Sequence, residues 1–204
     1  MISSPRGLFG GLLAGSVFVA VATSATLANA GSMVIGGLTS QPIGHYEFCQ
    51  TNPEECSIRP RDQRPLHLTE VVWRQIVGVN DAVNAAVRPM NDIDVYGKEE
   101  VWAYPNGVGD CEDFALEKRR ALMLRGISPA NLLMTVVRKA DGEGHAILTV
   151  RTDRGDFILD NLNPQVLPWD RTGYRFLKRQ SSQNTGRWVS IQGGDQTLVG
   201  SVSQ

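Results

Sequence analysis

The clearest hydrophobic pattern of the chain lies in the range 68–87. Its apolar residues alternate steps of four and three: Val72, Ile76, Val79, Val83 and Ala86. This spacing places them on one face of a helix. Pro89 cannot continue a helix, so we expect the helix to end at about Arg88. A neighbouring stripe carries Asn80 and Asn84, whose amides are expected to bond backbone or solvent, with metal or substrate contact as the alternative.

A second helix is predicted from Asp110 to Arg125. Asp110 is a residue type that caps helix N-termini, and Gly126 follows the expected last residue. The side predicted to be buried consists of Phe114, Leu116, Ala121, Leu122 and Leu124. The charged run of Glu117, Lys118, Arg119 and Arg120 is expected to form a solvated face.

After residue 126 the pattern changes to short β-rich segments at 132–137, 145–150 and 157–162. Turn sequences separate them, and 187–191 is a further candidate strand. Helices followed by such strands predict an α+β fold, in which N-terminal helices pack on an antiparallel sheet.

The first 30 residues differ from the rest of the chain. Arg6 is their only charged residue, an apolar run follows at 8–27, and Ala28-Asn29-Ala30 closes it. This order is typical of an export signal, so we predict a signal peptide over 1–30, with an uncleaved membrane anchor as the alternative. The remaining chain carries 19 basic and 21 acidic residues, which gives no electrostatic reason to bind nucleic acid.

Three further segments are expected after the signal. Residues 31–65 are rich in Gly, Pro and polar residues without a sustained period, which predicts an irregular arm. Residues 66–192 would form a single domain. The last segment, 193–204, is expected to be a flexible tail.

The cysteines divide into a pair and a single residue. Six residues separate Cys49 from Cys56, a spacing that can close a small disulfide in an oxidising compartment. Cys111 is then left as a free thiol. A leftover cysteine in an exported protein is a candidate for chemistry, and a buried structural cysteine is the alternative.

Carboxylates surround Cys111 in the segment 107–114, Gly-Val-Gly-Asp-Cys-Glu-Asp-Phe. A helix N-terminus lowers the pKa of a thiol, whereas adjacent carboxylates raise it. A bound cation would remove this conflict. We therefore expect a calcium-supported cysteine nucleophile beside Asp110, Glu112 and Asp113; simple helix capping is the alternative role for these three residues.

A thiol nucleophile needs a base, and the base needs a group that orients it. Of the three histidines, His45 and His67 lie in or near the arm, whereas His145 opens a strand. Asp160 lies on the next strand. A two-residue turn within 153–155 would place Asp160 on the same face as His145, and a three-residue loop would place it on the opposite face.

The sequence defines the other calcium ligands and the hydrogen-bond donors to the oxyanion less clearly. Calcium takes about six to eight oxygen atoms, so backbone, water or the 80–96 region would have to complete the shell. Residues 92–97 begin like an EF-hand loop, but Ala103 occupies the position of its bidentate Glu, so we reject that motif. A zinc site is disfavoured for lack of ligands. For the oxyanion we expect the backbone N–H of Cys111 with Trp102 or Asn106.

Several motifs together resemble a known family. They are Gly-Asp-Cys-Glu-Asp-Phe-Ala at 109–115, Gly-His-Ala at 144–146 and Leu-Asp-Asn-Leu at 159–162, with Trp102, Pro105 and Trp169 around them. In this order and spacing, the range 66–174 resembles the bacterial transglutaminase-like cysteine proteinases of the papain and transglutaminase superfamily. The set is specific as a whole, whereas Gly-Asp-Cys alone is not.

The resemblance implies a periplasmic endopeptidase. Cys111 would be the nucleophile, His145 the general base and then acid, and Asp160 the orienting carboxylate. The best-known branch of the family cuts a large surface adhesin, is regulated by a membrane partner, and depends on calcium bound by the acidic residues beside the nucleophile, which would here be Asp110, Glu112 and Asp113. We expect a monomer with a protein substrate.

Two alternatives stay open. A transglutaminase or amidase would use the same triad up to the thioester and differ only in the acyl acceptor or the amide attacked. A calcium- or peptide-binding envelope module, in contrast, would leave Cys111 without a catalytic role.

Overall fold

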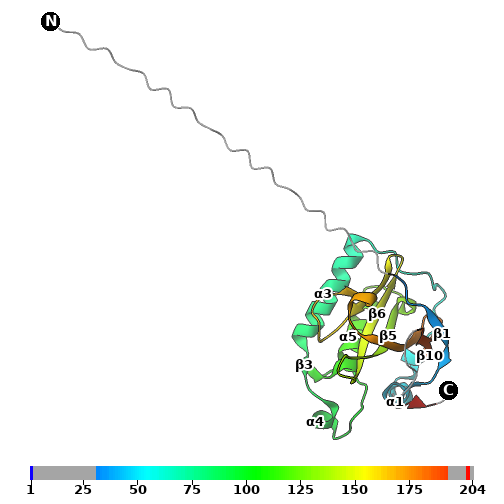
Figure 1. The fold of residues 1–204 in the computed structure, drawn as a ribbon. Helices are drawn as coiled ribbons and strands as arrows, with labels where there is room; N and C mark the ends of the chain where they lie inside the picture. The colour runs from blue at the N-terminus through cyan, green and yellow to red at the C-terminus, as the bar shows by residue number, and fades with distance from the viewer. Residues whose placement is uncertain (2–30, 193–200, 203–204) are drawn as a thin grey trace.

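A seven-stranded antiparallel sheet organises the computed structural model, which describes residues 1, 31–192 and 201–202 (Figure 1). In order across the sheet, its strands are β1 (Ile35–Thr39), β10 (Asn184–Ile191), β9 (Arg175–Ser181), β5 (Leu132–Arg138), β6 (Gly144–Thr152), β7 (Gly155–Leu159) and β8 (Leu167–Pro168). Every neighbouring pair is antiparallel, so the predicted α+β class is confirmed.

Five helices accompany the sheet in the described part of the chain: α1 (Ile43–Thr51), α2 (Pro53–Cys56), α3 (Glu70–Ala86), α4 (Asp92–Tyr96) and α5 (Cys111–Met123). Two short 3₁₀ helices, η1 (Pro129–Asn131) and η2 (Trp169–Arg171), complete the helical elements. Two small sheets pair β2 (Gln41–Pro42) with β11 (Ser201–Val202) and β3 (Arg88–Pro89) with β4 (Val108–Gly109). None of the described helices combines the length and apolarity needed to cross a membrane.

The main core lies between α3, α5 and one face of the sheet. Ile76 and Val79 of α3 meet Phe114 and Leu122 of α5 in one buried cluster. Helix α3 begins where expected, because the Thr69 hydroxyl accepts a hydrogen bond from the backbone N–H of Val72 at 3.2 Å. Both long helices thus follow from the 3.6-residue period of their apolar side chains.

The hairpin β6–β7 has the tighter of the two possible turns. Thr152 pairs with Gly155, which leaves only Asp153 and Arg154 in the turn. Since side chains alternate across a strand, this register puts Asp160, just after β7, on the same face as His145.

Helix α3 also holds the segment that follows β7. The side-chain amide of Asn84 donates to the backbone carbonyl of Asp160 at 2.9 Å, and that of Asn80 donates to the carbonyl of Pro164 at 2.9 Å. The two amides therefore bond backbone, which was the main interpretation of the sequence.

The expectation of an irregular arm over 31–65 is wrong. This segment forms β1, β2, α1 and α2, and β1 is the edge strand of the main sheet. Its backbone pairs with a strand remote in sequence, so its order comes from tertiary contacts and leaves no local period. The predicted signal peptide (1–30) and most of the predicted tail (193–204) lie outside the described residues, although residues 201–202 pair with β2.

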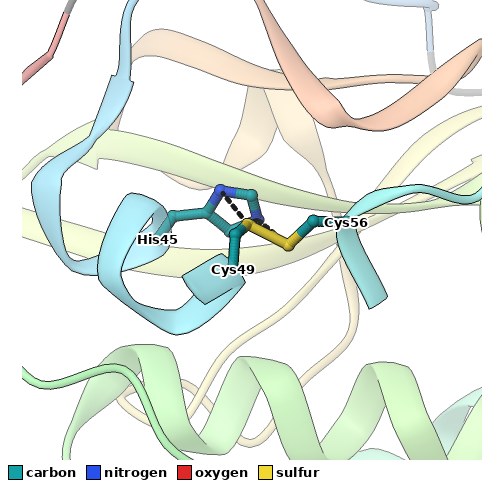
Figure 2. Close-up of side chains that lie close together, drawn as sticks. All are labelled: His45, Cys49 and Cys56. Atoms are coloured by element: carbon teal, nitrogen blue, oxygen red, sulfur yellow. Dashed lines mark hydrogen bonds between the residues drawn. A yellow bond between two sulfur atoms is a disulfide. The ribbon is translucent and has the colours of Figure 1, made fainter. Parts of the chain in front are cut away.

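Cys49 and Cys56 form the expected disulfide, which joins α1 to α2 (Figure 2). His45 lies one helical turn before Cys49 and is fully buried, with its Nδ1 atom 3.5 Å from the Cys49 sulfur. Burial and the charge of Arg119 lower the pKa of His45 to about 3, so its ring is neutral at physiological pH. His45 is therefore a core residue of the α1 region.

The charged run on α5 is not solvated as predicted. Lys118 and Arg119 are both buried, whereas Arg120 is exposed. Glu55 of α2 pairs with Arg119 at 2.8 Å, and the Lys118 ammonium lies 5.8 Å from the centre of the Phe114 ring. Charge pairing across the fold allows a burial that the sequence alone does not reveal.

Replacing both cysteines, as Cys49→Ala with Cys56→Ala, should lower the free energy of unfolding by about 2.5 kcal/mol. The disulfide closes a loop with a sequence separation of 7, and its removal returns that much conformational freedom to the unfolded chain. Urea denaturation measures the change, and wild type in a thiol reductant is the matched control. An unchanged unfolding midpoint would contradict this account.

Candidate active site

Cys111 is the first residue of α5, and its sulfur lies against the start of β6. The backbone N–H of Ala146 donates to the Cys111 sulfur at 3.3 Å, and the thiol donates to a carboxylate oxygen of Glu112 at 3.2 Å. Burial and then the charge of Glu112 raise the pKa of the Cys111 thiol well above its usual value. The N-terminus of α5 alone therefore does not produce a thiolate in this environment.

His145 and Asp160 form a buried pair next to this sulfur. His145 precedes Ala146, and its Nε2 atom lies 2.8 Å from Oδ1 of Asp160. The backbone N–H of Leu162 donates to the same oxygen at 3.0 Å. Burial alone would raise the pKa of Asp160, but hydrogen bonds from His145, Tyr174 and Leu162 outweigh it and lower that pKa, so the carboxylate stays ionised.

Tyr174 is a contact that the sequence did not reveal. Its hydroxyl donates to Oδ2 of Asp160 at 2.6 Å, and its ring meets the His145 ring edge to face, 5.6 Å between centres. Tyr174 immediately precedes β9, a strand that the sequence pattern did not predict. The charged residues Lys178 and Arg179 in the middle of β9 hide its alternation, although both are buried.

Two cavities have Cys111 in their lining. The first has a volume of about 270 Å³ and includes Glu100, Trp102 and Val136 in its lining. The second, of about 510 Å³, includes Met90, Asn91 and Leu162. Cys111, Gly144 and His145 line both cavities. The thiol and the imidazole are therefore next to space on the protein surface that a substrate could enter.

The three groups expected to donate hydrogen bonds to the oxyanion differ in their positions relative to the cavities. Trp102 lines the first cavity, but its indole N–H donates to Glu100 at 2.8 Å. Asn106 lines neither of these two cavities. The backbone N–H of Cys111 belongs to the first turn of α5, where amides have no partner within the helix.

Three carboxylates gather behind the thiol, but they are not the predicted three. Oxygen atoms of Asp92, Asp110 and Asp113 lie within 4.8 Å of one another, and Glu112 is not among them. Asp92 of α4 joins Asp110 and Asp113 there, whereas Glu112 contacts the Cys111 thiol and also interacts through side-chain hydrogen bonds with Asp92 and Asp110. Asp92 is thus a further candidate ligand beside the predicted three.

This acidic cluster has the features of a cation site. One buried oxygen of each member has no hydrogen-bond partner: Oδ1 of Asp92, Oδ1 of Asp110 and Oδ2 of Asp113. The other oxygens of Asp92 and Asp113 accept the backbone N–H groups of Val101 and Ala103. Burial, with repulsion from neighbouring carboxylates, raises the pKa of Asp113 to about 7 and also raises the pKa of Asp92. A hard cation with oxygen ligands fits this donor set.

An α+β fold that brings a cysteine at a helix start against a histidine and an aspartate on an antiparallel sheet is typical of papain-like and transglutaminase-like enzymes. The model of the bacterial transglutaminase-like cysteine proteinases (BTLCP) matches residues 35–196, and the chain belongs to this family. The resemblance noted in the sequence is thereby confirmed, and the protein is a cysteine protease by family. The match also includes most of the predicted arm.

Solved structures of Legionella pneumophila LapG are similar to this chain. One is 26% identical with a TM-score of 0.50, covering 61% of this chain and 71% of that chain. A calcium-bound LapG structure is 23% identical, with a TM-score of 0.51 and coverages of 62% and 75%. An EGTA-treated one is 25% identical, with a TM-score of 0.50 and coverages of 58% and 67%. Among curated proteins, none matches the chain.

Without divalent cations, Asp113→Asn should gain stability relative to wild type as the pH rises from 4 to 7. In this window the folded state keeps a proton on Asp113 that the unfolded state releases, so rising pH weakens wild type through this group, a contribution that Asp113→Asn lacks. Solvent screening reduces the difference to roughly 2 kcal/mol.

Thermal unfolding in a chelator at several pH values measures this difference. The buried His45 shifts stability in the opposite direction, but it is common to both chains and cancels. Asp81→Asn, on the exposed side of α3, is the matched control and should follow wild type. A difference between Asp113→Asn and wild type that does not grow with pH would contradict the raised pKa.

Proposed function

We propose that this chain is an exported endopeptidase that cuts a protein substrate through Cys111, His145 and Asp160. The observation that supports this most directly is the contact of the thiol with Ala146, next to a histidine held by a buried carboxylate. Because Asp160 engages Nε2 of His145, Nδ1 is the nitrogen left to take the thiol proton.

The reaction follows from these roles. His145 removes the proton of Cys111, and the sulfur attacks the carbonyl carbon of the scissile peptide bond. The oxyanion would be stabilised by the backbone N–H of Cys111, and by Trp102 if its indole leaves Glu100. His145 then protonates the leaving amine, and water hydrolyses the thioester with His145 again as base. Asp160 stabilises the imidazolium in each step.

We propose calcium as the cofactor, held by Asp92, Asp110 and Asp113. The unpartnered oxygens of these three residues support the assignment, as does the calcium-bound state of a LapG structure. When bound, calcium would supply positive charge next to the helix turn that carries Cys111. Glu112, the other predicted ligand, contacts the thiol and lies beside this set.

The substrate class follows from family membership and from the cavities. A protease family implies a protein substrate, and two cavities lined by Cys111 and His145 offer space for it beside the thiol. From the resemblance described above, we propose a surface adhesin as substrate, a periplasmic location and a membrane regulatory partner.

Cys111→Ser should abolish cleavage, His145→Ala should nearly abolish it, and Asp160→Asn should reduce turnover through loss of imidazole orientation, with all three chains folded. Mass spectrometry of envelope proteins treated with wild type or Cys111→Ser identifies the cut sites. A labelled primary amine in the same reactions tests the rival acceptor. Its incorporation would favour a transglutaminase, and cleavage by Cys111→Ser would refute the thiol mechanism.

Asp92→Asn should weaken calcium binding at least roughly tenfold, because calcium affinity follows the number of charged ligands. Isothermal titration calorimetry on protein stripped with a chelator measures this directly. Asp81→Asn, on the exposed side of α3, is the matched control and should bind calcium like wild type. The role of Asp92 fails if Asp92→Asn keeps the full binding heat, and the cation proposal fails if wild type shows no heat.

A further inference from the structure

We propose that Tyr174 is a positioning residue for the reaction, acting through Asp160 on His145; this inference rests on the proposed function. The Tyr174 hydroxyl donates to Oδ2 of Asp160 at 2.6 Å, the oxygen that His145 does not contact. Neither the family pattern found in the sequence nor the expected triad includes this residue.

The hydrogen bonds around Asp160 show what the hydroxyl contributes. Oδ1 has two donors, Nε2–H of His145 at 2.8 Å and the N–H of Leu162 at 3.0 Å. Tyr174 donates to Oδ2. Asp160 is 3% exposed, so water is a poor substitute for this donor. Donors on both oxygens fix the rotation of the carboxylate, and with it the direction of the bond to His145.

The Tyr174 ring contributes a second contact. Its centre lies 5.6 Å from that of the His145 ring at an interplanar angle of 61°. An edge-to-face contact of this kind restricts tilting of the imidazole. Tyr174 therefore touches both partners of the His145–Asp160 bond, one through its hydroxyl and the other through its ring.

The local backbone explains how Tyr174 reaches this place. Helix η2 ends just before Gly173, which has a φ of +75° and so turns the chain in a conformation that favours glycine. The N–H of Tyr174 also donates to the Thr172 hydroxyl at 3.4 Å. Strand β9 then holds the residues after Tyr174 in the sheet. The backbone is therefore fixed both before and after Tyr174, which determines where its ring lies.

Tyr174 remains a donor under physiological conditions. Burial and the neighbouring Asp160 raise the pKa of its hydroxyl, which keeps the proton in place. Lys118 on α5 also faces Asp160: burial lowers the pKa of this lysine to about 7, and the charge of Asp160 acts against that lowering.

The test compares Tyr174→Phe with Tyr104→Phe. Tyr104 is the matched control because its hydroxyl also donates to a carboxylate, Glu55, at 2.8 Å, away from the triad. With a fluorogenic peptide built on the mapped cleavage site and calcium in excess, Tyr174→Phe should lower kcat roughly tenfold, the loss expected for a hydrogen bond to a charged group. KM should change less than about twofold, and Tyr104→Phe should keep kcat and KM within about twofold of wild type.

A double-mutant cycle separates positioning from a structural role. In the Asp160→Asn background the ionised acceptor is gone, so adding Tyr174→Phe should cause no further loss of kcat. A merely structural tyrosine would cause the same loss in both backgrounds. Two results would overturn the proposal. One is a double mutant in which each substitution lowers kcat by its full separate factor, and the other is a Tyr174→Phe chain with the kcat of wild type.

Thermal unfolding of each variant completes the design. If Tyr174→Phe does not fold at the assay temperature, Tyr174→Leu is assayed in its place; failure of both to fold would overturn the proposal, because the residue would then serve stability. Asp160→Asn with the turnover of wild type would refute the triad itself. A slow Asp160→Asn beside a fast Tyr174→Phe would refute only the role of Tyr174.

Discussion

The contact between the first turn of α5 and the start of β6 determines the geometry of the site. The Ala146 N–H that reaches the Cys111 sulfur belongs to the residue after His145, so one hydrogen bond sets the position of the thiol relative to the imidazole. This contact depends on the packing of α5, whose Phe114 and Leu122 lie in the core between helix and sheet. The chemistry thus relies on an ordinary helix-on-sheet interface.

The same turn carries an electrostatic cost. Asp110 and Asp113 lie close to Asp92, and burial raises the pKa of all three, with repulsion from neighbouring carboxylates adding to the rise at Asp92 and Asp113. A fold that gained nothing from these carboxylates would be more stable with apolar residues in their place. Their unpartnered oxygens and their place behind Cys111 make a cation the simplest way to offset that cost. The proposed calcium therefore has a structural consequence as well as a chemical one.

The elements that could be predicted from the sequence are those marked by a local period, a cap residue or a turn sequence. The period of α3 located that helix, Asp110 and Gly126 bounded α5, and the tight turn at Asp153 was one of two stated alternatives. Asp92 lies in the 80–96 region that was expected to complete the calcium shell, but it was not singled out because α4 has only five residues. Glu112 was chosen because it is adjacent to Cys111 in sequence, and it contacts both the thiol and the acidic cluster. Tyr174 could not be found, since its strand contains buried charges that pair only in the folded chain.

The two sides of the candidate site are stabilised differently. Asp160 is held by its own carbonyl bond to Asn84 and by donors from His145, Leu162 and Tyr174. These bonds form within the protein, so the base and its orienting carboxylate are already ordered. The thiol side contains three carboxylates that each keep one buried oxygen without a hydrogen-bond partner among the described residues. Under the proposed function, calcium would therefore control the nucleophile and leave the base unchanged.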